Sequence, residues 1–190
     1  MTAEEAIKIF KDTGVLMDGH FLLTSGKHSP KFLQCSQVLQ RPEATGPLGR
    51  AVAGFFAGER VETVIGPAMG GVILAYETAR ALGARAIYAE KGEGGGFVLR
   101  RGFSLRPGER VLLVEDAVTT GGSVKQVLAL VVKLGAVPVG IGALVDRSGG
   151  KVDLGVPLKA VAAMEVEAYD PADCPLCRAG VPLTRPKAGG

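Results

Sequence analysis

The chain has 190 residues, of which 47% are hydrophobic and 22% are charged, so it is typical of one globular domain and not of a disordered protein. Its formal net charge of +3 is too small to indicate nucleic-acid binding. No apolar stretch reaches the ~18–20 residues of a membrane span, and the N-terminus has no apolar segment typical of a signal peptide. The odd number of cysteines, 3, favours a reducing compartment. We therefore expect a cytoplasmic protein without membrane or nucleic-acid partners.

The first part of the chain predicts a helix, two short strands and a second helix. Apolar residues at helical spacing predict a helix over residues 2–11. Two short strands are expected within residues 20–34, on either side of a turn at residues 25–28. A helix is then expected from about 42 to 56, with Pro42 in its first turn.

The middle of the chain alternates between strand and helix patterns. Strands are predicted at 61–65, 84–89, 110–114 and 137–145, and helices at 71–81 and 122–134. A Gly-rich loop at 91–96 leads into a predicted hairpin through residues 97–103. This alternation is typical of a doubly wound, mostly parallel α/β sheet. We expect one domain over residues 1–183, comprising the sheet, an N-terminal hood from about 1–40 and an irregular C-terminal segment, followed by a mobile tail at 184–190.

The segment after the strand at 110–114 carries the chemistry. Two acids, Glu115 and Asp116, follow the buried strand, and a loop of hydroxyl residues and glycines (119–123) opens directly into a helix. A helix N-terminus offers free N–H groups to a phosphate, while the two carboxylates suit ribose hydroxyls or hydrated Mg²⁺. The pattern favours a ribose-phosphate pocket. The alternative is a polar turn before an ordinary helix that is capped by Thr119 or Thr120. Neither a Walker A motif nor a G-x-G-x-x-G motif is present.

Several motifs resemble those of known enzymes. The segment Val114-Glu-Asp-Ala-Val-Thr-Thr-Gly-Gly122 resembles the phosphoribosyl-diphosphate (PRPP) binding signature of type I phosphoribosyltransferases. Residues 19–33 resemble the hood strand of the orotate phosphoribosyltransferase family, and Gly66-Pro-Ala-Met-Gly-Gly71 resembles the loop that meets the diphosphate. Leu144-Val-Asp-Arg147 resembles the segment whose Arg contacts orotate. The likeness runs in matching order from about residue 14 to residue 147.

The resemblance implies a phosphoribosyltransferase fold with a hood, usually a homodimer. It implies transfer of the phosphoribosyl group from PRPP to orotate with Mg²⁺, giving orotidine 5'-monophosphate and diphosphate in pyrimidine biosynthesis. Mg²⁺ would be held by the diphosphate and the ribose hydroxyls, without protein ligands. The implied catalytic residues are Lys91 and Asp116, and the implied orotate contacts are Thr119, Arg147 and Phe32. The implied PRPP contacts are Glu115, Asp116, Ala117, Val118, Thr119, Thr120, Gly121, Gly122, Ser123 and Lys91. Arg100 and Arg101 are added to them as a hypothesis of our own.

The chain also departs from the family pattern. The basic loop is short, so Arg100 and Arg101 either replace the missing cations or form a solvated hairpin face. Met69-Gly70 stands where relatives often have Tyr-Lys, which leaves the diphosphate to backbone N–H groups. Arg147 alternatively forms an ion pair with Asp146 or Glu115, and Phe32 alternatively fills the core. Thr24 stands where some relatives have Lys. Lys27 and His28 either take part in catalysis or belong to a polar surface turn.

Two alternative functions and one unexplained motif remain. A PRPP-sensing regulator of the same fold would need a basic face or a helix-turn-helix, and the sequence predicts neither. A phosphoribosyltransferase for another base would not need Arg147. The pair Cys174-Pro-Leu-Cys177 has half of a zinc-ribbon spacing, but a zinc site would require a dimer mate or Cys35 plus a His. We expect a reduced cysteine pair in a C-terminal turn, without bound metal.

Overall fold

The computed structural model describes residues 1–23 and 25–185 of the chain. Its centre is a six-stranded sheet with the strand order β5-β4-β3-β6-β7-β8. All neighbours in it are parallel except β4 and β5. The strands are β3 (Thr63–Pro67), β4 (Arg85–Lys91), β5 (Phe97–Val98), β6 (Arg110–Val118), β7 (Val137–Asp146) and β8 (Leu158–Ala163). The doubly wound, mostly parallel α/β fold that the sequence predicts is thereby confirmed.

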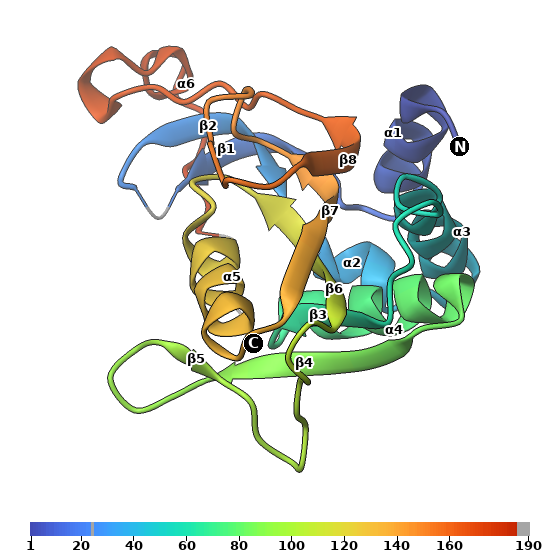
Figure 1. Cartoon of the computed structure of the whole chain (residues 1–190). Helices are drawn as coiled ribbons and strands as arrows, with labels where there is room; N and C mark the ends of the chain where they lie inside the picture. Colours follow the sequence, from blue (N-terminus) through green and yellow to red (C-terminus); the bar gives the residue numbers. More distant parts are fainter. Residues whose placement is uncertain (24, 186–190) are drawn as a thin grey trace.

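Helices cover both faces of the sheet (Figure 1). Strand β6 shows why, because its successive apolar side chains alternate between two cores. Leu112 and Val114 pack into one core with helices α1, α3 and α4, whereas Val111 and Leu113 pack into the other with α5. The helices are α1 (Ala3–Asp12), α2 (Ser36–Leu39), α3 (Pro42–Gly54), α4 (Gly70–Leu82), α5 (Gly122–Lys133) and α6 (Pro175–Arg178), with a 3₁₀ turn η1 (Pro171–Asp173). Within the described residues, no helix combines the length and the apolar character that crossing a bilayer would need.

The hood is an antiparallel hairpin of β1 (Leu16–Leu22) and β2 (His28–Leu33). The C-terminal segment returns to it, since Tyr169 exchanges backbone hydrogen bonds with His28 and Thr184 does so with β1. Hood and C-terminal segment therefore form one layer beside the carboxyl ends of the central strands (Figure 1). Thr184 is thus attached to the hood, while most of the tail predicted at 184–190 lies outside the described residues. The predicted domain limits stay a prediction.

Most of the predicted elements are present with ends shifted by a few residues. Two differences concern strands. The hairpin predicted over residues 97–103 instead joins β4 to β5 across the Gly-rich loop, with Lys91 opposite Phe97. Strand β8, which pairs with β7, lies in a segment for which the sequence predicts only irregular structure. Its alanine-rich composition gives no strand signal, and the pairing comes from the open edge of β7.

A buried carboxylate joins the amino-terminal ends of the central strands. Glu109 is only 3% exposed. It accepts hydrogen bonds from the Thr63 hydroxyl at 2.5 Å, the Arg85 guanidinium at 2.8 Å and the Arg106 backbone N–H at 2.8 Å. Burial alone would raise the pKa of Glu109, but these hydrogen bonds outweigh it and lower the pKa to about 2. The carboxylate therefore stabilises the fold in its ionised form.

We expect the substitution Glu109→Gln to remove about 3 kcal/mol of stability at neutral pH. A depressed carboxyl pKa contributes stability above the unfolded value near 4.5, and this contribution is lost as the pH falls toward about 2. The difference in unfolding free energy between wild type and variant should therefore shrink from pH 5 downward. Urea unfolding at several pH values measures it, with Glu93→Gln, an exposed loop carboxylate, as the matched control. A difference independent of pH would contradict this assignment.

Candidate active site

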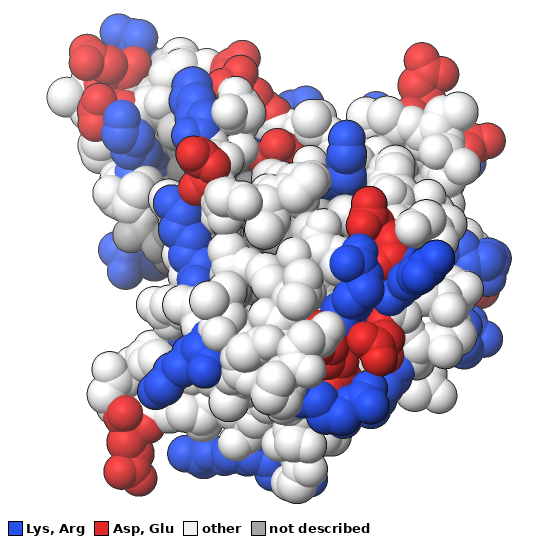
Figure 2. Space-filling view, in the orientation of Figure 1, with Lys and Arg blue, Asp and Glu red and all other residues white. Residues whose placement is uncertain are grey.

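The strand order defines where a ligand can bind. From β3 the chain passes through α4 to β4 on one side, and from β6 it passes through α5 to β7 on the other. The loops after β3 and β6 therefore diverge, which creates a crevice at the carboxyl ends of these two strands. In Figure 2 the left outline of the molecule is indented between the hood above and the β4–β5 hairpin below. The predicted diphosphate loop and the acid pair both come to this switch point.

A hollow of about 190 Å³ lies at the end of β6. It is lined by Glu115, Ala117, Val118, Thr119, Thr120, Gly121, Gly122, Ser123 and Val124. Helix α5 begins there behind Gly121, which has φ +72° and makes no side-chain capping hydrogen bond. The alternative of a helix capped by Thr119 or Thr120 is thus wrong. The first N–H groups of α5 are left for a ligand, and an anion such as a phosphate matches them.

Of the two acids at the end of β6, Glu115 is buried and Asp116 is half-buried. The Asp116 carboxylate accepts a hydrogen bond from the Ala117 N–H at 2.7 Å, and a Glu115 oxygen lies 3.3 Å from the Asp116 nitrogen. Burial, followed by the charge of Asp116, raises the pKa of Glu115 to about 8. Burial also raises the pKa of Asp116. Two carboxylates that resist ionisation together are suited to hydroxyl groups or a cation, either of which would relieve their repulsion.

The loop after β3 lies directly against Asp116. A Cβ atom on Gly70 would be 3.0 Å from the Asp116 carboxylate, so the absence of a side chain at Gly70 is what lets the two loops meet. A Cβ atom on Gly71 would likewise be 3.0 Å from the Val114 carbonyl oxygen. In the sequence, this loop was identified only by its resemblance to the family's diphosphate loop. The signal for its role is the Gly-Gly pair that follows a buried strand.

Arg147 follows β7 and lies beside the acid-bearing strand. Its backbone N–H donates to the Val118 carbonyl at 2.8 Å. Its Nε is buried without a hydrogen-bond partner, and burial lowers the pKa of its guanidinium. Within residues 1–23 and 25–185 it forms no ion pair, so the alternative pairing with Asp146 or Glu115 is not observed. A half-buried guanidinium whose Nε lacks a hydrogen-bond partner is suited to an anionic ligand.

The hood carries the predicted aromatic side chain, Phe32, on strand β2. Phe32 is half-buried and packs on Phe21 with ring centroids 5.6 Å apart, whereas Leu33 belongs to the core. Cys35, just after β2, directs its thiol toward the Asp116 carbonyl at 3.8 Å, which ties the hood to the site. Cys35 was not predicted as part of the site. Thr24 lies outside the described residues.

The three predicted loop cations do not line the hollow. Lys91 ends β4, with its ammonium 5.9 Å from the centroid of the Phe97 ring. Arg101 forms an ion pair with Glu90, with Nε 2.6 Å from Oε1, and this contact raises the pKa of Arg101. Arg100 is exposed. All three belong to the β4–β5 hairpin region, beyond the walls of the hollow.

Fold and site together define a class. A doubly wound sheet, an acid pair before a Thr/Gly loop at a helix start, and a hood over the crevice are the features of a type I phosphoribosyltransferase. A family model described as "Phosphoribosyl transferase domain" matches residues 43–161. A solved orotate phosphoribosyltransferase from Aeropyrum pernix superposes with TM-score 0.70 at 27% identity, over 83% of this chain and 92% of that one.

Two relatives narrow the class. An orotate phosphoribosyltransferase of Pelotomaculum thermopropionicum is 53% identical over 98% of this chain and 97% of its own length. An orotate phosphoribosyltransferase of Thermotoga maritima is 50% identical over 96% of this chain and 97% of its own length. This chain belongs to the orotate phosphoribosyltransferase family.

Proposed function

We propose that this chain transfers the 5-phosphoribosyl group from PRPP to orotate, in the pyrimidine biosynthesis that yields UMP. The bond between ribose C1 and the diphosphate oxygen breaks, the bond between C1 and the orotate ring nitrogen forms, and diphosphate leaves with the C–O electron pair. The proton of that ring nitrogen is released to the diphosphate or to water. The observation that carries the proposal is the uncapped start of α5 beside the buried Glu115, the half-buried Asp116 and Arg147, whose Nε is buried without a hydrogen-bond partner. Together they offer a phosphate site, a ribose site and an anion site at one crevice.

Each group then has a distinct role. The N–H groups of the first turn of α5 and the hydroxyls of Thr119, Thr120 and Ser123 would hold the 5-phosphate. Glu115 and Asp116 would hold the ribose hydroxyls and stabilise the positive charge that develops on the sugar. Arg147 would hold the orotate carboxylate through two parallel hydrogen bonds, with Thr119 and Phe32 completing the base site.

Mg²⁺ fits the site formed by the ribose hydroxyls and the acid pair Glu115 and Asp116, because a hard cation prefers carboxylate and hydroxyl oxygens. When bound with PRPP, it would neutralise charge on the leaving diphosphate. The remaining cations, Lys91, Arg100 and Arg101, are proposed to approach the diphosphate from the β4–β5 hairpin. We propose that this approach is made across a dimer.

A homodimer is supported by an apolar surface on α4. Met69, Ile73 and Tyr76 follow helical spacing and are 82%, 45% and 63% exposed. A second copy of the chain would cover them, and sedimentation equilibrium of the purified protein tests this. The cytoplasm is proposed as its location, because three free cysteines suit a reducing compartment.

The decisive experiment follows the loss of orotate absorbance with PRPP and Mg²⁺, with uracil, adenine and hypoxanthine as parallel bases. We expect Mg²⁺-dependent consumption of orotate in strong preference to the other bases. Consumption of a purine would assign the chain to another base. Binding of PRPP without consumption of any base would favour the sensing role instead.

A further inference from the structure

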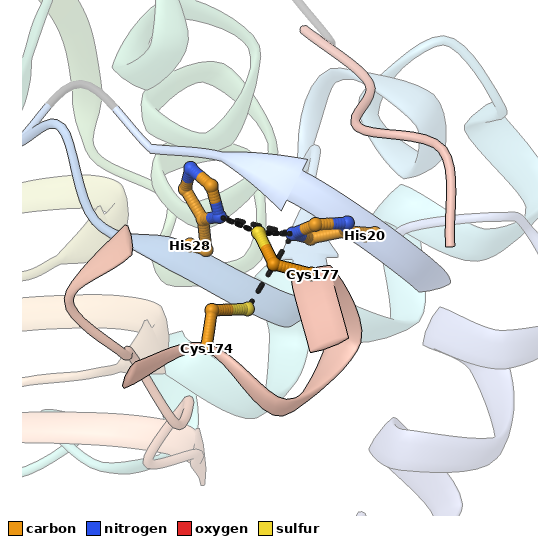
Figure 3. A group of neighbouring side chains, drawn as sticks. All are labelled: His20, His28, Cys174 and Cys177. Carbon is orange, nitrogen blue, oxygen red and sulfur yellow. Dashed lines mark hydrogen bonds between the residues drawn. The ribbon is translucent and has the colours of Figure 1, made fainter. Parts of the chain in front are cut away.

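Four metal-ligating side chains converge between the hood and the C-terminal segment (Figure 3). They are His20 on β1, His28 on β2, and Cys174 and Cys177 around the short helix α6. These are both of the chain's 2 histidines and two of its 3 cysteines. His20 and Cys174 are 2% and 0% exposed, whereas Cys177 is exposed. A group of this composition is typical of a Cys₂His₂ zinc site.

The spacing of the four ligand atoms matches a tetrahedron. With Zn–N near 2.0–2.1 Å and Zn–S near 2.3 Å, ideal tetrahedral edges are about 3.3 Å between two nitrogens and about 3.6 Å between nitrogen and sulfur. The His20 Nε2 and the His28 Nδ1 are 3.0 Å apart. The nitrogen–sulfur distances are 3.5 Å for Cys174 to His20, 3.8 Å for Cys177 to His20 and 3.2 Å for Cys177 to His28. All four atoms lie within 4.8 Å of one another.

Hydrogen bonds within the cluster cannot satisfy these four side chains as well as a bound cation would. The Nδ1 of His20 lies 2.7 Å from the Val181 carbonyl oxygen, which can only accept, so this nitrogen carries the proton. The Nε2 of neutral His20 is then unprotonated, with a single lone pair. His28 Nδ1 and both sulfur atoms crowd around that lone pair. A cation at the centre would use the lone pair, while the Val181 carbonyl would fix the orientation of the ring.

We propose that His20, His28, Cys174 and Cys177 bind one structural zinc ion. Two thiolates and two imidazoles in a tetrahedron favour zinc over magnesium or calcium. All four positions are occupied by protein atoms, so the site has no open coordination position for a substrate. The proposal is independent of the reaction, because none of the four residues lines the hollow at the start of α5.

The consequence is a link between distant parts of the chain. His20 and Cys174 are 154 positions apart, and His28 and Cys177 are 149 positions apart. Backbone hydrogen bonds from Tyr169 and Thr184 already align the C-terminal segment with the hood. Zinc would fix this alignment and thereby the hairpin that carries Phe32. The sequence favoured a reduced cysteine pair without metal, and a zinc site was held to require a dimer mate or Cys35 plus a His. That requirement is wrong, because two hood histidines of the same chain lie beside the two cysteines.

The test measures metal in the full-length protein, purified under reducing conditions without chelator. We expect about one zinc per chain by mass spectrometry of the metal, and a fall in melting temperature of more than about 5 °C after zinc removal. Cobalt(II) added to the reduced apoprotein should give the visible bands of a tetrahedral ion and a near-ultraviolet thiolate band. The cobalt titration needs no variant, so it stands even if a substitution impairs folding.

Variants locate the ion. Cys177→Ser, at the exposed ligand, should lower the zinc content at least fivefold and weaken the near-ultraviolet thiolate band of the cobalt-loaded protein. Cys35→Ser, the matched cysteine control, should keep one zinc per chain. Zinc retained in Cys177→Ser but lost in Cys35→Ser would overturn the assignment. Less than about a tenth of an equivalent of zinc, together with an octahedral cobalt spectrum for the reduced apoprotein, would overturn the site itself.

Discussion

Replacing Asp116 with Asn is expected to lower kcat about 10²-fold or more, with an unchanged fold. The Asp116 carboxylate lies at the end of β6 against Gly70, where the ribose of PRPP is proposed to bind. The amide keeps the size of the side chain and an oxygen for the Ala117 N–H, but it removes the negative charge that would stabilise the cation-like sugar. Steady-state kinetics with saturating PRPP, orotate and Mg²⁺ measure the effect.

The same substitution should stabilise the protein without ligands. Asp116 is a half-buried carboxylate whose pKa is raised by loss of solvation, so its ionised form costs folding free energy near neutral pH. Its loss should raise the unfolding free energy and should lower the pKa of Glu115, which the neighbouring charge raises. Lower activity with higher stability separates a catalytic effect from misfolding.

Asp12→Asn is the matched control for this charge removal. Asp12 is an exposed carboxylate at the end of α1 that pairs with Lys8, far along the chain from the crevice. Both its kinetics and its unfolding free energy should stay close to those of the wild type, within about 0.5 kcal/mol. If Asp116→Asn retained wild-type kcat, Asp116 would have no role in the chemical step.

The unit of β6, its loop and α5 could be predicted from the sequence because every signal in it is local. A short, nearly unbroken apolar run between turn residues is typical of a strand covered on both faces, and the acids and glycines that follow indicate where the strand ends and the helix begins. The position of the ligand crevice then follows from the sheet topology. The roles of individual residues at the crevice remain predictions, although Arg147 gains support from its unpaired Nε.

Features that depend on distant pairing could not be predicted. Strand β8 has the weak sequence Leu-Lys-Ala-Val-Ala-Ala and forms because β7 presents an open edge. The His–Cys cluster needs the C-terminal segment to cross the hood, which no local pattern in either segment indicates. The available signal was compositional, since both histidines stand in one hairpin and two cysteines stand in one turn. Long-range position of this kind is determined by the tertiary fold.

The loop cations illustrate a second limit of prediction from sequence, which concerns contacts between subunits. Lys91 was predicted from the likeness to a family, and Arg100 and Arg101 were predicted as replacements for cations that the short loop lacks. The proposed partner of all three is the diphosphate of a neighbouring chain. In the structure Arg101 pairs with Glu90, and Lys91 lies over Phe97. A sequence specifies which charges are available, whereas the subunit that uses them depends on assembly.

Truncating Arg147 is expected to raise the KM for orotate by roughly 30-fold or more, which corresponds to about 2 kcal/mol or more for a lost buried charge pair. The KM for PRPP should change little, because the 5-phosphate and ribose are proposed to bind at α5 and at the acid pair. Arg147→Lys should be intermediate, since an ammonium keeps the charge but not the paired donors of a guanidinium. Initial rates over a matrix of both substrates separate these effects.

The base itself provides the sharper comparison. Uracil lacks the carboxylate of orotate, so its kcat/KM, measured at high enzyme concentration, should be nearly the same in wild type and Arg147→Ala. The preference for orotate over uracil should therefore collapse through the orotate value alone. Arg50→Ala, which removes an exposed guanidinium from α3, should preserve both values. Equal losses for orotate and uracil would mean that Arg147 supports the site's structure and does not read the carboxylate, because a carboxylate contact can only affect the base that carries one.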